Sequence, residues 1–443
     1  MNIFEYSNVI IFICVLIIVS YLFNIISKWS KIPSVILLLG TGMLLRYASD
    51  LGSIELPPVE NLLKILGTIG LIMIVLEGSL DLKISRDKLG LINRSFLSAL
   101  IVLLLSNLLI TWVIVLWLPH ASWHSALVYA IPLSVISSAI VIPSINSLSE
   151  EKKEFSLYEA TFSDILGILL FNFIASTQLT DNTGNYAAGY MLSMVVGLAA
   201  CIAFSLGLVV LINKITSHAK FFLIYAILIL LYVVGKQNHL PSLLLILVFG
   251  LIINNLGLIT KGKLAKYYNE ERFNNTRREL YHITAESSFL IRTFFFILFG
   301  YYIDLALLIN PDVIVVGSTI VMSLILVRYF YLRFLLNSSI MPELFLIPRG
   351  LITIILFFSI PAAFDISGFN EGVISFVILA TSLLMMVGLI LNRKEEGTLP
   401  VMVEDRYGDT GLIIGDARLT IPEDESGIHD DDNEPNEAPE KPE

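Results

Sequence analysis

The most regular feature of this chain is a repeated alternation of apolar runs of about 20 residues with short polar stretches. A helix needs about 20 apolar residues to cross the hydrocarbon core of a bilayer. The pattern therefore predicts an all-α polytopic membrane protein with about 13 transmembrane helices. We place these near residues 7–27, 32–48, 61–80, 95–118, 123–148, 155–178, 187–213, 220–235, 240–259, 280–303, 313–336, 340–364 and 373–391.

The basic residues between the spans predict the orientation. Nineteen Lys and Arg fall on one set of loops, and only Arg46, Lys64 and Lys236 fall on the other. Cytoplasmic loops carry the excess of basic residues in membrane proteins. We therefore expect a multi-pass protein of the cell inner (plasma) membrane, with the N-terminus outside and the C-terminus in the cytoplasm.

Composition agrees with a membrane domain followed by a different segment. Of the 443 residues, 56% are hydrophobic and only 15% are charged, whereas soluble domains are about 25% charged. The net charge of the chain is −10, and residues 393–443 alone carry −11, since they hold 16 acidic and 5 basic side chains. We expect residues 1–392 to form the membrane domain and residues 393–443 an acidic cytoplasmic tail, largely disordered. Short apolar runs within 401–422 leave a small folded or docking element as the alternative.

Several chemistries lack their usual sequence signatures. Cys14 and Cys201 both lie in apolar runs, and the six histidines have no metal-ligand spacing. The chain contains no Walker A sequence, no His-Glu-x-x-His and no Gly-x-Ser-x-Gly. We therefore expect no enzyme activity, no cofactor and no nucleic-acid partner.

Two spans contain helix-breaking residues. The fifth contains Pro132 and Pro143, and the twelfth contains Pro342, the run Pro348-Arg349-Gly350 and Pro361. A break at bilayer depth is tolerated only where it faces protein or water. Because the two spans lie seven apart, they predict two inverted six-helix repeats with discontinuous helices 5 and 12, and a binding site where these cross.

The run Glu159-Ala160-Thr161-Phe162-Ser163-Asp164 carries two carboxylates into an apolar span. A charged group at bilayer depth costs about 2.5 kcal/mol or more and usually lines an ion path. Asp164 can hold either a proton or a cation, and this mutual exclusion is the minimum chemistry of an exchanger. The alternative is that Asp164 caps a helix end or neutralises an arginine.

Other side-chain oxygens lie in the same span as Asp164, at the predicted break of the fifth span or near a span end, where they could bind an ion together with Asp164. Sodium and similar hard cations prefer oxygen ligands. Ser and Thr also bond to the preceding turn of their own helix, and Glu77 lies near the end of its span, where it could equally be solvated. The candidate ion or proton ligands beside Asp164 are Ser163, Thr161, Ser137, Ser138 and Glu77.

Three arginines lie within or beside apolar segments: Arg292, Arg328 and Arg349. Each needs a carboxylate or backbone-carbonyl partner there. We expect Arg328 to pair with Glu159, which lies about 140° round the helix from Asp164. The alternative for Glu159 is a solvated position near the membrane surface together with Glu154.

These motifs resemble those of the monovalent cation:proton antiporter superfamily, the sodium/proton exchangers. Glu159 to Asp164 is similar to the Glu-Ser-x-x-Asn-Asp motif with the same spacing of Glu and Asp. Further likenesses are Lys31-Ile32-Pro33-Ser34-Val35, Leu76-Glu77-Gly78-Ser79-Leu80-Asp81-Leu82, Arg328 in the eleventh span and Pro348-Arg349-Gly350 in the twelfth.

The resemblance implies roles and an architecture. Asp164 would be the ion-binding, proton-exchanging carboxylate, with Na⁺ or K⁺ as its metal ion, and Glu159 with Arg328 the structural ion pair. A homodimer would form with scaffold helices at about 7–80 and 220–303, a mobile core at about 95–178 and 313–391, and a linker helix at 187–213. Transport would follow elevator-like alternating access in the lipid bilayer.

Departures from the family pattern refine the function. Ala160 and Ser163 stand where the motif has Ser and Asn. Relatives that carry Asp-Asp at the positions of Ser163 and Asp164 are electrogenic. One carboxylate therefore favours electroneutral one-for-one exchange, with Na⁺ as the first candidate. Ser137-Ser138-Ala139 stands where many sodium/proton exchangers have Thr-Asp-Pro and is closer to potassium/proton branches, so K⁺/H⁺ exchange is the alternative. A gated cation channel or sensor is the alternative from another class.

Overall fold

A computed structural model of the protein describes residues 3–30, 32–52, 60–82, 88–145, 148–177, 197, 199, 202–208, 220–237, 242–255, 270–336 and 341–391. All regular secondary structure in these residues is helical. The chain divides into Met1–Gly397 and Thr398–Glu443. The predicted acidic tail and most of the predicted span at 187–213 lie outside the described residues.

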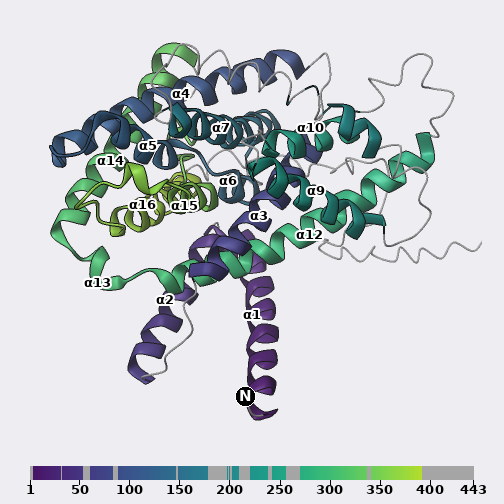
Figure 1. Ribbon diagram of the computed structural model, residues 1–443, viewed down its shortest axis with the longest axis horizontal. Helices are drawn as coiled ribbons and strands as arrows, with labels where there is room; N and C mark the ends of the chain where they lie inside the picture. The colour runs from purple at the N-terminus through teal and green to yellow at the C-terminus, as the bar shows by residue number, and fades with distance from the viewer. Residues whose placement is uncertain are drawn as a thin grey trace, which may run out of the picture. The chain divides into compact units, whose positions relative to one another are not determined.

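Helices follow one another through the described part of the chain (Figure 1). The first half contains α1 (Ile3–Ser30), α2 (Ser34–Gly52), α3 (Glu60–Asp81), α4 (Leu89–Trp117), α5 (Trp123–Ser134), α6 (Ser138–Ser144) and α7 (Glu150–Thr177). The second half contains α9 (Lys220–Gln237), α10 (Ser242–Asn254), α12 (Glu270–Tyr302), α13 (Leu305–Leu308), α14 (Pro311–Phe330), η4 (Tyr331–Leu336), η5 (Glu343–Phe345), α15 (Leu351–Phe358), η6 (Ala362–Phe364) and α16 (Gly372–Leu391).

The predicted all-helical membrane class is confirmed. Within the described residues, eight helices are long and apolar enough to cross a membrane. The count of 13 stays a prediction. Helices α7 and α12 begin at Glu150 and Glu270, well before the predicted apolar runs, because polar residues can continue a helix beyond the apolar stretch that reveals it.

The helices pack in two groups along the chain. The long helix α12 packs against α2 and α3, and α10 packs on α3 (Figure 1). Helices α4, α5 and α7 pack on one another, α6 packs on α7, and α14 packs on α4 and α16. Helix α3 also contacts α6, α7 and α15, so it joins the first group to the second.

Glycines allow α2 and α12 to approach closely. A Cβ atom at Gly42 would lie 2.1 Å from the carbonyl oxygen of Ile297, and one at Gly300 would lie 2.3 Å from that of Leu39. Small residues at helix interfaces bring backbones together in membrane proteins, where dispersion contacts drive association. The α2–α12 contact therefore depends on these two positions.

Both spans predicted to be broken are interrupted. The chain runs from α5 through extended residues 135–137 into α6. The twelfth span, predicted at 340–364 as discontinuous, is α-helical only at Leu351–Phe358, preceded by the 3₁₀ turn η5 and five irregular residues. Pro348 explains this, since it has no N–H to donate and disfavours helix at the preceding residue.

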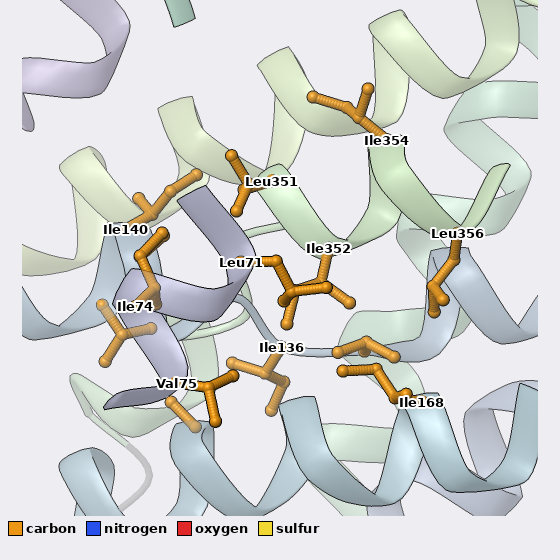
Figure 2. Packing of buried hydrophobic residues seen from close by; sticks show 14 of the residues in the cluster. Leu71, Ile74, Val75, Ile136, Ile140, Ile168, Leu351, Ile352, Ile354 and Leu356 are labelled. Carbon is orange, nitrogen blue, oxygen red and sulfur yellow. The ribbon is translucent and has the colours of Figure 1, made fainter. Parts of the chain in front are cut away.

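Aliphatic side chains enclose the two interruptions (Figure 2). Leu71, Ile74 and Val75 of α3 lie on one side of Ile136, which belongs to the interrupted fifth span. Ile168 of α7 and Leu351 of α15 also belong to this buried cluster. Polar groups within the interruptions therefore lie in an apolar environment, where an unsatisfied group is costly.

We predict that Gly42→Ala destabilises the protein by about 1–3 kcal/mol, because the added methyl group meets the α12 backbone, which cannot move without shifting the helix. Gly40→Ala is the matched control, since no atom lies within 4 Å of a Cβ there and alanine favours helix over glycine. Thermal unfolding in detergent measures both. Equal shifts of the two variants would contradict the close approach.

Candidate functional site

The two interrupted spans cross through a backbone hydrogen bond. The amide of Ser137 donates to the carbonyl of Pro348, with N and O 2.9 Å apart. Gly350 lies directly beside this bond, because a Cβ there would be 2.7 Å from Ser137 Oγ. A side chain at position 350 would therefore displace the side chains of Ser137 and Ile140.

Arg349 satisfies the carbonyl groups that the break leaves without helical partners. Its Nε donates to Leu133 O at 2.7 Å and one terminal nitrogen donates to Ser134 O at 3.2 Å. The other terminal nitrogen donates to Ile347 O at 2.7 Å, while the Arg349 amide donates to Thr381 Oγ1 at 3.0 Å. The Arg349 guanidinium lies at the C-terminal end of α5, where the helix dipole favours positive charge.

Asp164 lies beside the crossing on α7 and is 3% exposed. Its Oδ2 accepts from the amide of Ser138, the first residue of α6, at 3.3 Å. Among the described residues, its Oδ1 has no hydrogen-bond partner. Helix capping therefore accounts for only one of the two carboxylate oxygens.

Hydroxyl groups beside Asp164 have different neighbours. Ser163 Oγ accepts from the amide of Ile136 at 2.9 Å, which ties α7 to the interruption. Ser137 Oγ is buried and has no partner among the described residues. Thr161 donates to Leu157 O in its own helix at 2.8 Å and lies against Gly78 of α3. The structure thus brings Asp164, Ser163, Ser137 and Ser138 to the crossing and places Thr161 at the α3 boundary.

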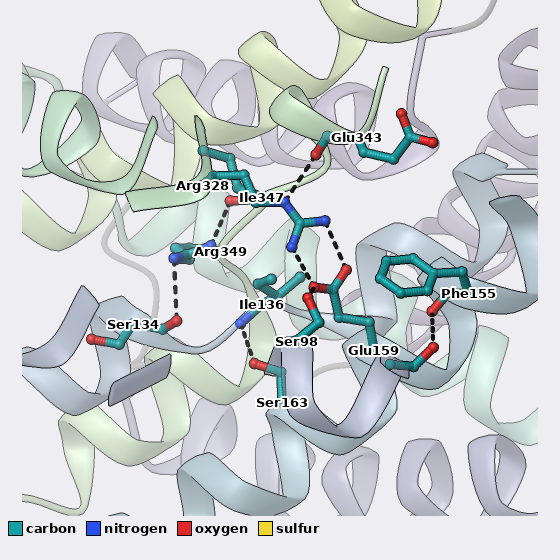
Figure 3. Close-up of polar contacts among 11 residues, drawn as sticks. Ser98, Ser134, Ile136, Phe155, Glu159, Ser163, Arg328, Glu343, Ile347 and Arg349 are labelled. Carbon is teal, nitrogen blue, oxygen red and sulfur yellow. Dashed lines mark hydrogen bonds and ion pairs between the residues drawn. The ribbon is translucent and has the colours of Figure 1, made fainter. Parts of the chain in front are cut away.

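Glu159 pairs with Arg328 inside the protein (Figure 3). Both terminal nitrogens of Arg328 bond to the carboxylate, one of them at 2.7 Å, and Ser98 of α4 donates to the same carboxylate. Arg328 Nε donates to the carbonyl of Glu343 at 3.1 Å. Since Arg328 is 0% and Glu159 2% exposed, the solvated alternative for Glu159 is wrong.

Glu77 contacts α12 rather than the crossing. Its Oε2 accepts from Ser288 Oγ at 2.6 Å and lies 3.5 Å from a terminal nitrogen of Arg292. The Glu77 side chain is buried, so the solvated alternative is also wrong here. The contacts of Glu77 place it with Arg292 in the packing of α3 on α12.

The sequence did not single out Ser98, Thr381 or Glu343 as parts of the site. Each makes a contact that depends on a residue far along the chain: Ser98 with Glu159, Thr381 with Arg349, and Glu343 with Arg328. A polar residue in or beside an apolar run was the only signal available. That signal is weak because serine and threonine are common in membrane helices.

The charged groups around the crossing differ in whether their polar atoms already have bonding partners. Glu159 already has a buried arginine, and Arg349 is held by carbonyls. Asp164 has one carboxylate oxygen without a hydrogen-bond partner among the described residues. Within the described residues, no three His, Cys, Asp or Glu side chains converge to form a metal centre.

The sequence of this chain matches a known protein family. The family profile described as sodium/hydrogen exchanger, transmembrane, matches residues 13–393. The chain belongs to the sodium/hydrogen exchanger family. The earlier resemblance is thereby confirmed, and this exchanger is a multi-pass membrane transporter.

Solved structures share the fold of this exchanger. The sodium proton antiporter MjNhaP1 from Methanocaldococcus jannaschii, at pH 8, aligns with a TM-score of 0.62 and 18% identity over 87% of this chain and 96% of that chain. A structure of MjNhaP1 from electron microscopy aligns with a TM-score of 0.64 and 18% identity over 88% of this chain and 96% of the other. A search of curated proteins finds no match.

We predict that Arg328→Ala destabilises the exchanger by about 3–5 kcal/mol, because it leaves the Glu159 carboxylate buried without its counter-charge. Ser163→Ala is the control within the same site. It removes only the acceptor of the Ile136 amide, at a cost of about 1–3 kcal/mol. Thermal unfolding of the purified proteins compares them, and similar shifts would argue against the ion pair as the main tie.

Proposed function

We propose that this protein exchanges a monovalent cation for a proton, one for one, with Asp164 as the shared binding group. The observation that carries the proposal is the buried Asp164 carboxylate at the crossing, with Oδ1 lacking a partner among the described residues. A buried charge in this apolar surrounding is costly unless a proton or a cation neutralises it. The two ligands therefore compete for one group.

Neutral oxygens would complete the cation site. Ser137 Oγ is buried beside the crossing and has no partner among the described residues, so it can turn a lone pair toward a cation. Ser163 and Ser138 contribute more by position: they fix the interruption against α7 through Ser163 Oγ and the Ser138 amide. Thr161 would bound the site on the α3 side.

Sodium is the first candidate ion. The family is named for sodium/hydrogen exchange, and MjNhaP1, which shares the fold, is a sodium proton antiporter. The Ser137-Ser138 pair keeps K⁺ as the alternative cation. Because one carboxylate serves the site, we propose that each cycle moves one cation against one proton and no net charge.

Alternating access would arise from two groups of helices that move relative to each other. We propose α1–α3 with α9, α10 and α12 as a scaffold that also forms a homodimer, and α4–α7 with α14–α16 as the mobile core. Internal ties support the grouping of the core, since Glu159–Arg328 and Ser137–Pro348 join its two halves. We further propose that the two halves are inverted repeats in a cell inner membrane, with the N-terminus outside.

We predict that Asp164→Asn reduces exchange to the background of empty vesicles, because the amide cannot release a proton or neutralise a cation. The variant should remain folded, since asparagine can still accept from the Ser138 amide. A pH-sensitive dye in proteoliposomes, with Na⁺, K⁺ and Li⁺ added in turn, measures exchange and the ion preference. Asp50→Asn, in an exposed pair with Arg46, is the control and should exchange normally.

Two outcomes would oppose this function. Exchange by the folded Asp164→Asn variant would remove Asp164 from the site. A cation conductance without proton movement in the wild-type protein would indicate a channel.

We predict that Ser137→Ala raises the apparent KM for the cation about tenfold, equivalent to 1.4 kcal/mol, because it removes one oxygen ligand. Ser134→Ala is the matched control: its hydroxyl donates to Ala130 O in its own helix at 2.8 Å. Cation titrations of exchange in proteoliposomes compare the two variants. An equal KM in both would exclude Ser137 as a ligand.

A further inference from the structure

The chain segment 341–350 leads directly into the crossing, and we call it the strap. It contains the 3₁₀ turn η5 and ends at the residues that meet the fifth span. Lys152 of α7 contacts it twice. Its Nζ donates to Met341 O at 3.1 Å and lies 3.4 Å from Glu343 Oε1.

Helix α7 holds the strap at a second point through the ion pair. Glu159 binds Arg328, and Arg328 Nε donates to the Glu343 carbonyl (Figure 3). Lys152 and Glu159 are seven residues apart, so they lie on one face of α7, two turns and about 10 Å from each other. Both contacts converge on Glu343, one at its side chain and one at its backbone.

The position of the strap matters because its other end builds the site. Pro348 O accepts from the Ser137 amide, and Gly350 leaves room for Ser137 Oγ. The same helix α7 carries Asp164. A shift of the strap along α7 would therefore move Ser137 relative to the carboxylate.

The Glu343 side chain makes this tie depend on Lys152. Glu343 is 5% exposed, and its Oε2 has no hydrogen-bond partner among the described residues. Within that part of the chain, Lys152 and Arg328 are the charged groups that face it. Without the Lys152 ammonium, a buried carboxylate would lose its direct counter-charge and would gain by moving toward water.

We infer that Lys152, acting through Glu343, is a positioning residue for the cation site: it holds the strap in register with α7, and so sets the distance between Ser137 and Asp164. This inference rests on the proposed function. Lys152 itself touches neither the cation nor the proton.

The experiment compares Lys152→Met with Lys153→Met. Lys153 is the adjacent lysine, and its pair is with the exposed Glu150 on the same helix at 3.6 Å. Lys152→Met should raise the apparent KM for Na⁺ or K⁺ about five- to tenfold with little change in maximal rate, since a small displacement of ligands weakens binding. Lys153→Met should leave KM unchanged. Lys88→Met, which breaks another α7 pair, with Glu154, should also leave it unchanged.

Hydrogen exchange gives a readout that does not need transport. In Lys152→Met, the peptide spanning residues 133–141 should exchange about tenfold faster, because the Ser137 amide loses its fixed partner. Lys153→Met should exchange at the wild-type rate. This result stands even if the wild-type protein fails to exchange ions, so failure of the proposed function is distinguishable from failure of the inference.

Conservative variants separate positioning from general stability. Lys152→Arg should keep the wild-type KM and the wild-type hydrogen-exchange protection of residues 133–141, because arginine has the same charge and a similar length. Glu343→Gln should weaken cation affinity as Lys152→Met does, and combining the two should add little to either. Wild-type KM and wild-type protection in Lys152→Met would overturn the inference. If Lys152→Met fails to fold, wild-type values in Glu343→Gln overturn it instead.

Discussion

A helix that is broken inside a membrane must find partners for its backbone groups within the protein, because lipid offers none. Arg349 meets this constraint by donating to Leu133 O, Ser134 O and Ile347 O at once. With those carbonyls satisfied, the fifth span can stop at Ser134 and restart at Ser138. The interruption of the fifth span depends on this guanidinium, whose rigid planar geometry a lysine cannot reproduce.

Among the described residues, the buried carboxylates form ion pairs, except for Asp164. Glu159 with Arg328 joins α7 to α14, and Glu77 with Arg292 joins α3 to α12. Each pair compensates the cost of burying its members. Asp164 differs because a backbone amide, rather than an arginine, bonds to it, and its Oδ1 has no hydrogen-bond partner among the described residues.

The sequence was informative where one residue determines its own surroundings. Pro348 lies in the interruption of the twelfth span, and the carboxylate in an apolar run marked Asp164. In the fifth span, Pro132 and Pro143 lie inside α5 and α6, on either side of the interruption at 135–137. It was less informative where a contact joins distant segments. Glu77 was a candidate ligand from its place in the span, but packing of α3 on α12 determined its partners. Glu343 followed a proline in an irregular segment, and nothing local indicated that its carbonyl would hold Arg328. The pairing of Glu159 with Arg328 was expected because buried arginines need acids, yet the register that permits it is a tertiary property.

Arg349 has a consequence for energetics beyond packing. Near the crossing, the negative charges of Asp164 and Glu159 are matched by the positive charges of Arg328 and Arg349. If Asp164 carries the exchange, the unloaded site is electrically balanced, and either a proton or a monovalent cation adds the same single positive charge. Movement of the loaded site inward and outward across the membrane would then require equal and opposite electrical work. Concentration gradients alone would set the direction of exchange, and a cell could run it unchanged when its membrane is depolarised.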